Sequence, residues 1–83
     1  MVQDSTYNES ELLIKVASGE QKAFTILVDY YWNKVYSHAL AYSNSVTRAE
    51  EITQDVLLNV WHKRAALTEV RDFKRYLFVL GKQ

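Results

Sequence analysis

Side chains that could catalyse a reaction are few in this chain of 83 residues, and they are not arranged for catalysis. His38 and His62 are far apart in the sequence, and neither has a second metal ligand at a suitable spacing. Glu50 and Glu51 are adjacent, so on a helix they point about 100° apart and form no catalytic pair. Cysteine is absent, which excludes a disulfide or a thiolate metal site. We therefore expect no enzyme, no metal and no cofactor.

One predicted helix carries side chains that suit docking to a partner protein. They lie outside the predicted apolar stripe of that helix and are Glu51, Gln54, Asp55, Leu58 and Trp61. An aspartate can hold an arginine of a partner helix, and tryptophan is a common anchor of interfaces. The alternative is that Leu58 and Trp61 pack on the first helix or at the edge of the domain.

A second group combines basic and aromatic side chains near the end of the chain. The cations are Arg71, Lys74, Arg75 and Lys82, and the aromatic residues are Phe73, Tyr76 and Phe78. This mixture suits single-stranded nucleic acid, because bases stack on rings and phosphates pair with cations. In the alternative interpretation Phe73 and Tyr76 belong to the core, and Phe78 is exposed or packs on the third helix.

The periodicity of apolar residues predicts four helices and no strand: about 9–18, about 20–42, from 47 to between 64 and 66, and from 73 onward. Four signals mark their ends. Asn8 caps the first helix, Gly19 ends it, and Asp72 caps the fourth. Thr47 forms a capping box with Glu50, which places Glu50 and Glu51 in the first turn of the third helix. Residues 67–71 are predicted to be a loop.

Apolar stripes on these helices predict an all-α fold, a compact bundle of four helices. The second helix carries the longest stripe. Tyr30, Trp32 and Tyr36 widen it, which suggests burial on more than one side. The predicted inward residues are Phe24, Leu27, Val28, Tyr31, Val35, Ala39 and Tyr42, then Ala49, Ile52, Val56 and Val60, then Phe73, Tyr76, Leu77 and Leu80.

Composition and charge limit the number of domains and the class of protein. An apolar fraction of 48% and an aromatic fraction of 13% predict one folded domain, 9–83, after a flexible tail, 1–8. Through Leu58 the chain has eight acidic and four basic residues, and from Asn59 it has two acidic and six basic. Without an apolar run of about 18 residues or a signal peptide, a cytoplasmic location is expected. The last helix lacks a stop signal, so we expect that the chain is cut before a further domain.

Two stretches stand out by the order and spacing of their residues: 49–61, Ala-Glu-Glu-Ile-Thr-Gln-Asp-Val-Leu-Leu-Asn-Val-Trp, and 72–78, Asp-Phe-Lys-Arg-Tyr-Leu-Phe. Together they resemble the extracytoplasmic-function (ECF) type of bacterial RNA polymerase sigma factor, in its second conserved region. The first stretch is similar to the most characteristic segment of that family, and the second resembles the start of its promoter-reading helix. The resemblance extends from about Glu9 to the end, although residues 80–83 depart from the family pattern.

The resemblance implies a transcription initiation factor. Its third helix would dock on the β′ clamp helices of RNA polymerase core through Gln54 and Asp55, with Leu58 and Trp61 nearby. Residues 66–72 and the fourth helix would melt the promoter minus-ten element and trap a flipped base of the non-template strand. Arg71, Lys74 and Arg75 would hold its phosphates. The missing part would be a helix-turn-helix domain, and a membrane-linked anti-sigma factor is a further expected partner. The rival hypothesis is a helical protein-interaction module without DNA contact.

Overall fold

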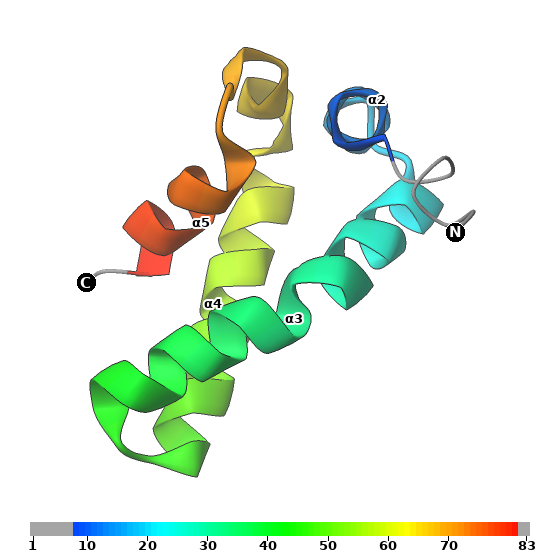
Figure 1. The fold of residues 1–83 in the computed structure, drawn as a ribbon. Helices are drawn as coiled ribbons and strands as arrows, with labels where there is room; N and C mark the ends of the chain where they lie inside the picture. The colour runs from blue at the N-terminus through cyan, green and yellow to red at the C-terminus, as the bar shows by residue number, and fades with distance from the viewer. Residues whose placement is uncertain (1–7, 82–83) are drawn as a thin grey trace, which may run out of the picture.

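The structure is a computed structural model that describes residues 8–81, and every regular element in that range is a helix (Figure 1). In chain order these are α2 (Glu9–Ala17), α3 (Gln21–Ser43), α4 (Val46–His62), the 3₁₀ helix η1 (Arg64–Glu69) and α5 (Phe73–Gly81). The predicted all-α fold is confirmed. The predicted tail, 1–8, lies outside the described residues apart from Asn8.

Three of the predicted helix ends are formed by the expected residues. The side-chain oxygen of Asn8 accepts a hydrogen bond of 3.1 Å from the backbone N–H of Glu11. Gly19 has a φ of 95°, a left-handed conformation that glycine adopts without steric cost. Asp72 Oδ1 accepts a hydrogen bond of 3.1 Å from the backbone N–H of Arg75, which fixes the start of α5.

The predicted start of α4 is wrong by one residue, and its predicted cap by two. Asn44 is in the left-handed region at φ 56°, and the chain reverses there directly into the next helix. Ser45, not Thr47, is the N-cap: its hydroxyl accepts a hydrogen bond of 3.2 Å from the backbone N–H of Arg48. Because α4 begins at Val46, Glu50 falls beyond its first turn, and the capping box with Thr47 does not form.

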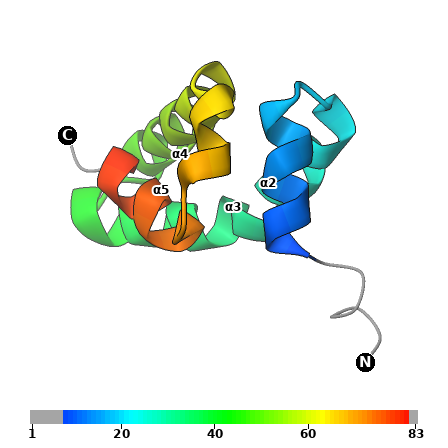
Figure 2. The same cartoon turned by 90° about the horizontal axis from the view of Figure 1, so that it is seen from above.

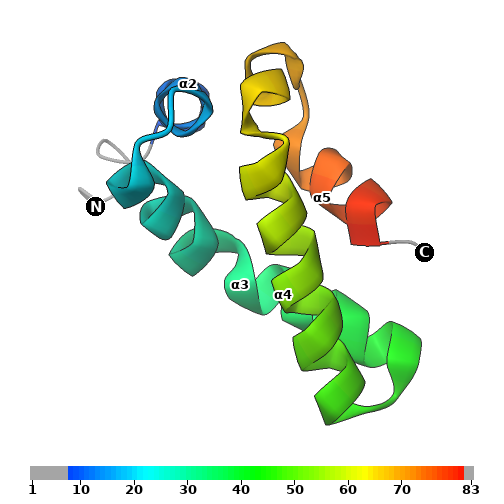
Figure 3. The ribbon, with the colours of Figure 1, turned by 180° about the vertical axis from the view of Figure 1, so that it is seen from behind.

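The helices pack around one core, with α3 and α4 crossing each other and α2 and α5 on opposite sides. Seen from behind, α4 crosses α3, to which the tight turn at Asn44 joins it (Figure 3). From above, α2 lies on one side of the molecule and α5 on the other (Figure 2). Further contacts join α2 to η1 and to α3, and α5 to α4 and to α3. No helix among the described residues is long and apolar enough to cross a membrane.

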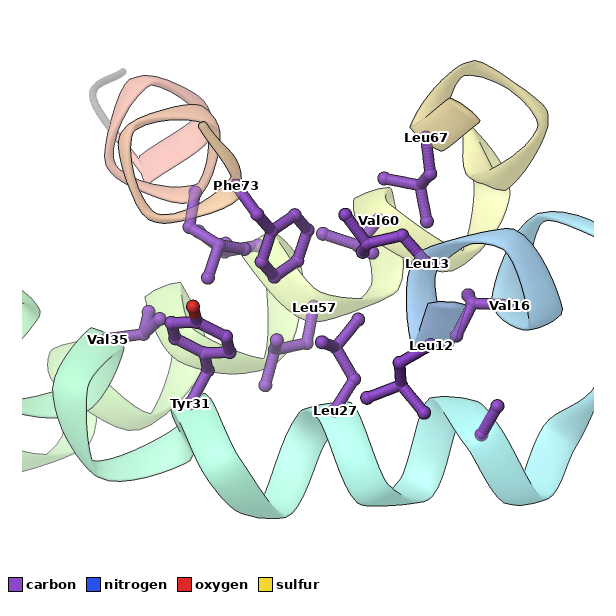
Figure 4. Close-up of a cluster of buried hydrophobic side chains, with 13 residues drawn as sticks. Leu12, Leu13, Val16, Leu27, Tyr31, Val35, Leu57, Val60, Leu67 and Phe73 are labelled. Atoms are coloured by element: carbon purple, nitrogen blue, oxygen red, sulfur yellow. The ribbon is translucent and has the colours of Figure 1, made fainter. Parts of the chain in front are cut away.

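Side chains from all five helices meet in the core (Figure 4). Phe73 of α5 is 1% exposed, and its ring centroid lies 5.2 Å from that of Tyr31 on α3. Leu67 is also 1% exposed, although a loop was predicted there. Residues 64–69 instead form η1, because Leu67 anchors this segment in the core and η1 packs on α2. Only residues 70–72 separate η1 from α5.

The buried stripe of α3 is narrower than predicted. It follows four-residue steps and consists of Ala23, Leu27, Tyr31, Val35 and Ala39. Tyr42 was predicted to point inward but is 66% exposed. The reason is local: Tyr42 lies at the rim of a hollow of about 110 Å³ where α5 reaches Gly81, and no described element covers its ring. Tyr30, also aromatic and predicted to widen the stripe, is 49% exposed.

Candidate protein-docking and nucleic-acid interfaces

The inner face of α4 fixes the direction of its outer face. Its buried residues are Ala49, Thr53, Val56, Leu57 and Val60. The Thr53 hydroxyl donates a hydrogen bond of 2.7 Å to the Ala49 carbonyl oxygen, so the one polar side chain on this face is satisfied within its own helix. With these residues inward, helical geometry turns Gln54 and Leu58 outward. Leu58 is 53% exposed.

Three of the five predicted docking residues border α3. Gln54 and Leu58 line a hollow of about 320 Å³, and its other walls are Phe24, Val28, Trp32 and Leu57. Leu58 and Trp61 line a neighbouring hollow of about 280 Å³ with Gln21, Phe24 and Thr25. The two hollows share Phe24 and Leu58. They form one groove between the outer sides of α3 and α4, and we call it the α3–α4 groove.

The α3–α4 groove contains residues that sequence reasoning placed elsewhere. Phe24 and Val28 were assigned to the buried stripe and Trp32 to its margin, but all three are only half-buried and line the groove. They follow one another at four-residue steps, parallel to the buried row Ala23, Leu27 and Tyr31. The presence of two adjacent apolar rows was the signal in the sequence that only one of them could be fully buried.

Trp61 packs within the domain as well as bordering the groove. Its ring centroid lies 4.9 Å from that of Phe24, and the guanidinium carbon of Arg64 lies 4.4 Å from the Trp61 ring centroid. Arg64 Nη1 also donates a hydrogen bond of 3.0 Å to the Trp61 carbonyl oxygen. A stacked guanidinium and a ring on the other helix hold the indole in place. Trp61 therefore packs within the domain on α3, not on the first helix as the alternative had it, whereas Leu58 is exposed.

The other two predicted docking residues do not line the α3–α4 groove. Asp55 lines a small hollow of about 50 Å³ on the side of α5, together with Arg48, Leu80 and Gly81 among others. Glu51 forms an exposed ion pair with Arg48, in which Oε1 and Nη1 are 3.3 Å apart. The structure thus brings Gln54, Leu58 and Trp61 together at the groove and leaves both carboxylates outside it.

The predicted DNA-contacting residues gather mainly at the start of α5. Lys74, Arg75 and Phe78 line an open hollow of about 340 Å³, together with Asp72 and Val79. Lys74 and Arg75 are exposed, and Phe78 is half-buried. Arg71 is exposed between η1 and α5 but does not line this hollow. Lys82 lies outside the described residues.

Phe78 packs on α3, although the sequence predicted exposure or contact with the third helix. Its ring centroid lies 4.7 Å from that of His38, and the two ring planes are 33° apart. Phe78 and His38 also line the hollow near Gly81. His38 therefore takes part in a surface contact between α3 and α5. His62, the second histidine, is exposed in the last turn of α4. No group of three potential metal ligands occurs among residues 8–81.

A comparison with protein families matches residues 27–83 to the family described as sigma-70 region 2. This range covers most of the chain. The chain belongs to the sigma-70 region 2 family. The comparisons with curated proteins and with solved structures found no significant match. As a sigma-70 region 2 domain, the chain has a role in transcription initiation, and its family implies interaction with RNA polymerase core and promoter DNA.

The matched range contains the α5 surface and part of the α3–α4 groove, whose residues Gln21, Phe24 and Thr25 precede it. It includes α4, η1, α5 and the part of α3 from Leu27, with Val28, Trp32 and Leu58 of the groove. Helix α2 precedes the match, yet Leu12, Leu13 and Val16 belong to the same core as Leu27 and Val60. Helix α2 also packs against η1, the element that precedes α5 in the chain.

Proposed function

We propose that this chain is the second region of an ECF sigma factor and that the α3–α4 groove binds RNA polymerase core. The observation that carries the proposal is Leu58, which is 53% exposed at the centre of the groove while its neighbour Leu57 is 5% exposed. An exposed leucine flanked by aromatic side chains is suited to receive an apolar anchor of a partner helix. Gln54 supplies a polar group at the rim.

The docking proposal is tested by capture of RNA polymerase core on the immobilised chain. Gln54→Ala and Leu58→Asp are expected to weaken binding, because one removes the polar group of the groove and the other places a charge in it. Asp55→Ala tests whether the docking surface on α4 extends beyond the groove. Lys22→Gln, at an exposed position of α3 outside the groove, is the matched control. Wild-type affinity in both groove variants would reject this face as the docking site.

We infer that the second surface, at the start of α5, binds the non-template strand of the promoter minus-ten element and stabilises it in the melted state. Lys74 and Arg75 are both exposed beside the half-buried ring of Phe78. Cations next to an aromatic ring suit phosphates and unstacked bases. Asp72 lies in the same hollow, and its carboxylate accepts the backbone N–H of Arg75. It thereby holds the helix end that presents the cations.

The DNA proposal is tested with labelled single-stranded DNA and fluorescence anisotropy at several salt concentrations. Each lost phosphate contact is expected to lower the slope of log affinity against log salt by about 0.7. Lys74→Gln with Arg75→Gln should therefore reduce the slope by roughly 1.4. If polymerase binds but DNA affinity depends on neither salt nor these cations, the chain is an interaction module without DNA contact.

A further inference from the structure

Three exposed side chains form a row along one side of α3. Tyr30, Lys34 and His38 follow at four-residue steps, so they lie above one another on the helix surface. Lys34 Nζ lies 5.8 Å from the ring centroid of Tyr30. The one carboxylate within α3 is Asp29, which points about 100° away from Tyr30 around the helix, on the side away from Lys34. The row therefore combines two rings and a cation with no acid among them.

Ring contacts connect both ends of this row to α5, directly at His38 and through Tyr31 at Tyr30. At one end His38 packs on Phe78, with 4.7 Å between ring centroids. At the other end the ring of Tyr30 lies 5.1 Å from that of Tyr31, which lies 5.2 Å from Phe73, the first residue of α5. The row Tyr30, Lys34 and His38 consequently runs beside α5. Phe78 belongs both to this contact and to the hollow of Lys74 and Arg75.

We propose that the row on α3 continues the path of single-stranded DNA from α5, so that Tyr30 stacks on a base and Lys34 pairs with a phosphate. This inference rests on the DNA role proposed for α5. Base–ring stacking tolerates any base and needs an accessible face, and Tyr30 is 49% exposed. Lys34, Lys74 and Arg75 would follow the backbone on either side of the contact between His38 and Phe78. The carboxylate of Glu9 on α2 accepts the hydrogen bond of the Tyr31 hydroxyl, so it is already engaged beside this row. The positive charges of Lys34, Lys74 and Arg75 favour a polyanion over an acidic or neutral partner.

The experiment measures the affinity of the 83-residue chain for labelled oligothymidylates lengthened one nucleotide at a time. For the wild type we expect affinity to rise beyond the length that occupies α5 alone. Tyr30→Ala should lower affinity about tenfold for the long strands and leave the shortest bound strands unaffected. Lys34→Gln should also reduce the salt slope by about 0.7, whereas Tyr30→Ala should leave that slope unchanged.

Matched variants separate a DNA contact from a structural effect. Tyr30→Phe keeps the ring and should bind as the wild type does. Lys22→Gln removes an equally exposed cation about three turns earlier on α3 and should have no length-dependent effect. Urea unfolding of each variant checks that the fold is kept, which we expect because Tyr30 and Lys34 are exposed.

The outcomes distinguish this inference from the function on which it rests. If long strands bind the Tyr30 and Lys34 variants as they bind the wild type, while Lys74→Gln with Arg75→Gln weakens binding, the α3 path is wrong and the α5 surface stands. An equal loss at every length would also overturn the extension, because Tyr30 would then act on the α5 site itself. If the wild-type chain binds no strand even at low salt, both proposals fail.

Discussion

The α3–α4 groove and the α5 surface differ in how the fold holds their side chains. The groove is formed by the two longest helices, and most of the side chains that line it are apolar. The α5 surface is on a helix of nine residues that follows a 3₁₀ helix, and its cations are long and exposed. A fixed apolar groove suits a shaped protein partner, whereas extended cations suit a flexible polyanion. One small bundle thus presents two recognition surfaces.

The largest expected effect tests whether the α5 surface depends on the shared core. Phe73 starts α5 and is 1% exposed against Tyr31. Phe73→Ala should lower the free energy of unfolding by about 3–5 kcal/mol, because it leaves a cavity in a well-packed site. Val79→Ala on the same helix, where the side chain is 59% exposed, should change it by less than about 0.5 kcal/mol. Urea unfolding measures both, and similar values would mean that α5 is not anchored through Phe73.

The next prediction separates the contribution of Leu58 to polymerase binding from its contribution to stability. Leu58→Asp should reduce polymerase binding at least about tenfold, since a charge at a desolvated contact costs several kcal/mol. The unfolding midpoint should change little, because Leu58 is exposed. Leu57→Asp is the opposite case: Leu57 is buried, so that variant should unfold. Titration calorimetry with polymerase core and thermal unfolding give the two values, and a folded Leu57→Asp variant would contradict the assigned inner face.

A third prediction concerns Trp61, which packs against Phe24 and also lines the groove. Trp61→Phe keeps a ring against Phe24 but removes part of the surface under Arg64. Because Trp61 is half-buried, we expect a loss of about 1–2 kcal/mol in unfolding free energy, within the usual range for single substitutions. Polymerase affinity should fall less than in Leu58→Asp. A larger binding loss for Trp61→Phe would make the indole, and not Leu58, the main anchor.

The cap of α4 allows a smaller, well-matched test. Ser45→Ala removes the hydroxyl that accepts the Arg48 N–H and should cost about 1 kcal/mol in unfolding free energy. Thr47→Ala lies inside the helix at an exposed position and should be neutral or slightly stabilising. Both are measured by urea unfolding. If Thr47→Ala lowered the unfolding free energy more than Ser45→Ala, Thr47 would be the cap and α4 would start later.

The smallest expected effect concerns Glu51, a carboxylate outside the groove. Glu51 and Arg48 are more than half exposed, and such an ion pair contributes less than about 1 kcal/mol to stability. Glu51→Gln should leave the unfolding free energy nearly unchanged. It should also weaken polymerase binding less than Gln54→Ala, because Glu51 lies outside the groove. A stronger effect on binding from Glu51→Gln would show that the docking surface extends beyond the groove.

Local signals in the sequence predicted much of this fold. The caps at Asn8 and Asp72 and the glycine turn at Gly19 depend on neighbouring residues alone, and all three were correctly predicted. The start of α4 was missed because Ser45 and Thr47 both carry a hydroxyl that can cap a helix. The left-handed turn at Asn44, which links two helices, selected the earlier one.

For the candidate site, the sequence by itself determined the residue types and their order on each helix face. It placed Gln54 and Leu58 opposite Val56 and Val60 on α4, and it placed Lys74 and Arg75 off the apolar stripe of α5. Helical periodicity fixes such positions without reference to any other element. The family resemblance at residues 49–61 and 72–78 depended on the same local order, and the family match is consistent with it.

Only the tertiary structure decided which of two apolar rows is buried and what each faces. On α3 the row of Leu27 became core while the row of Phe24 and Trp32 became the wall of a groove. Leu67 became a core residue of η1 and not part of a loop. Periodicity gives the angle between rows on one helix, but burial depends on where a neighbouring helix crosses it. That crossing is set by the packing of α2, α4 and α5, which no single segment encodes.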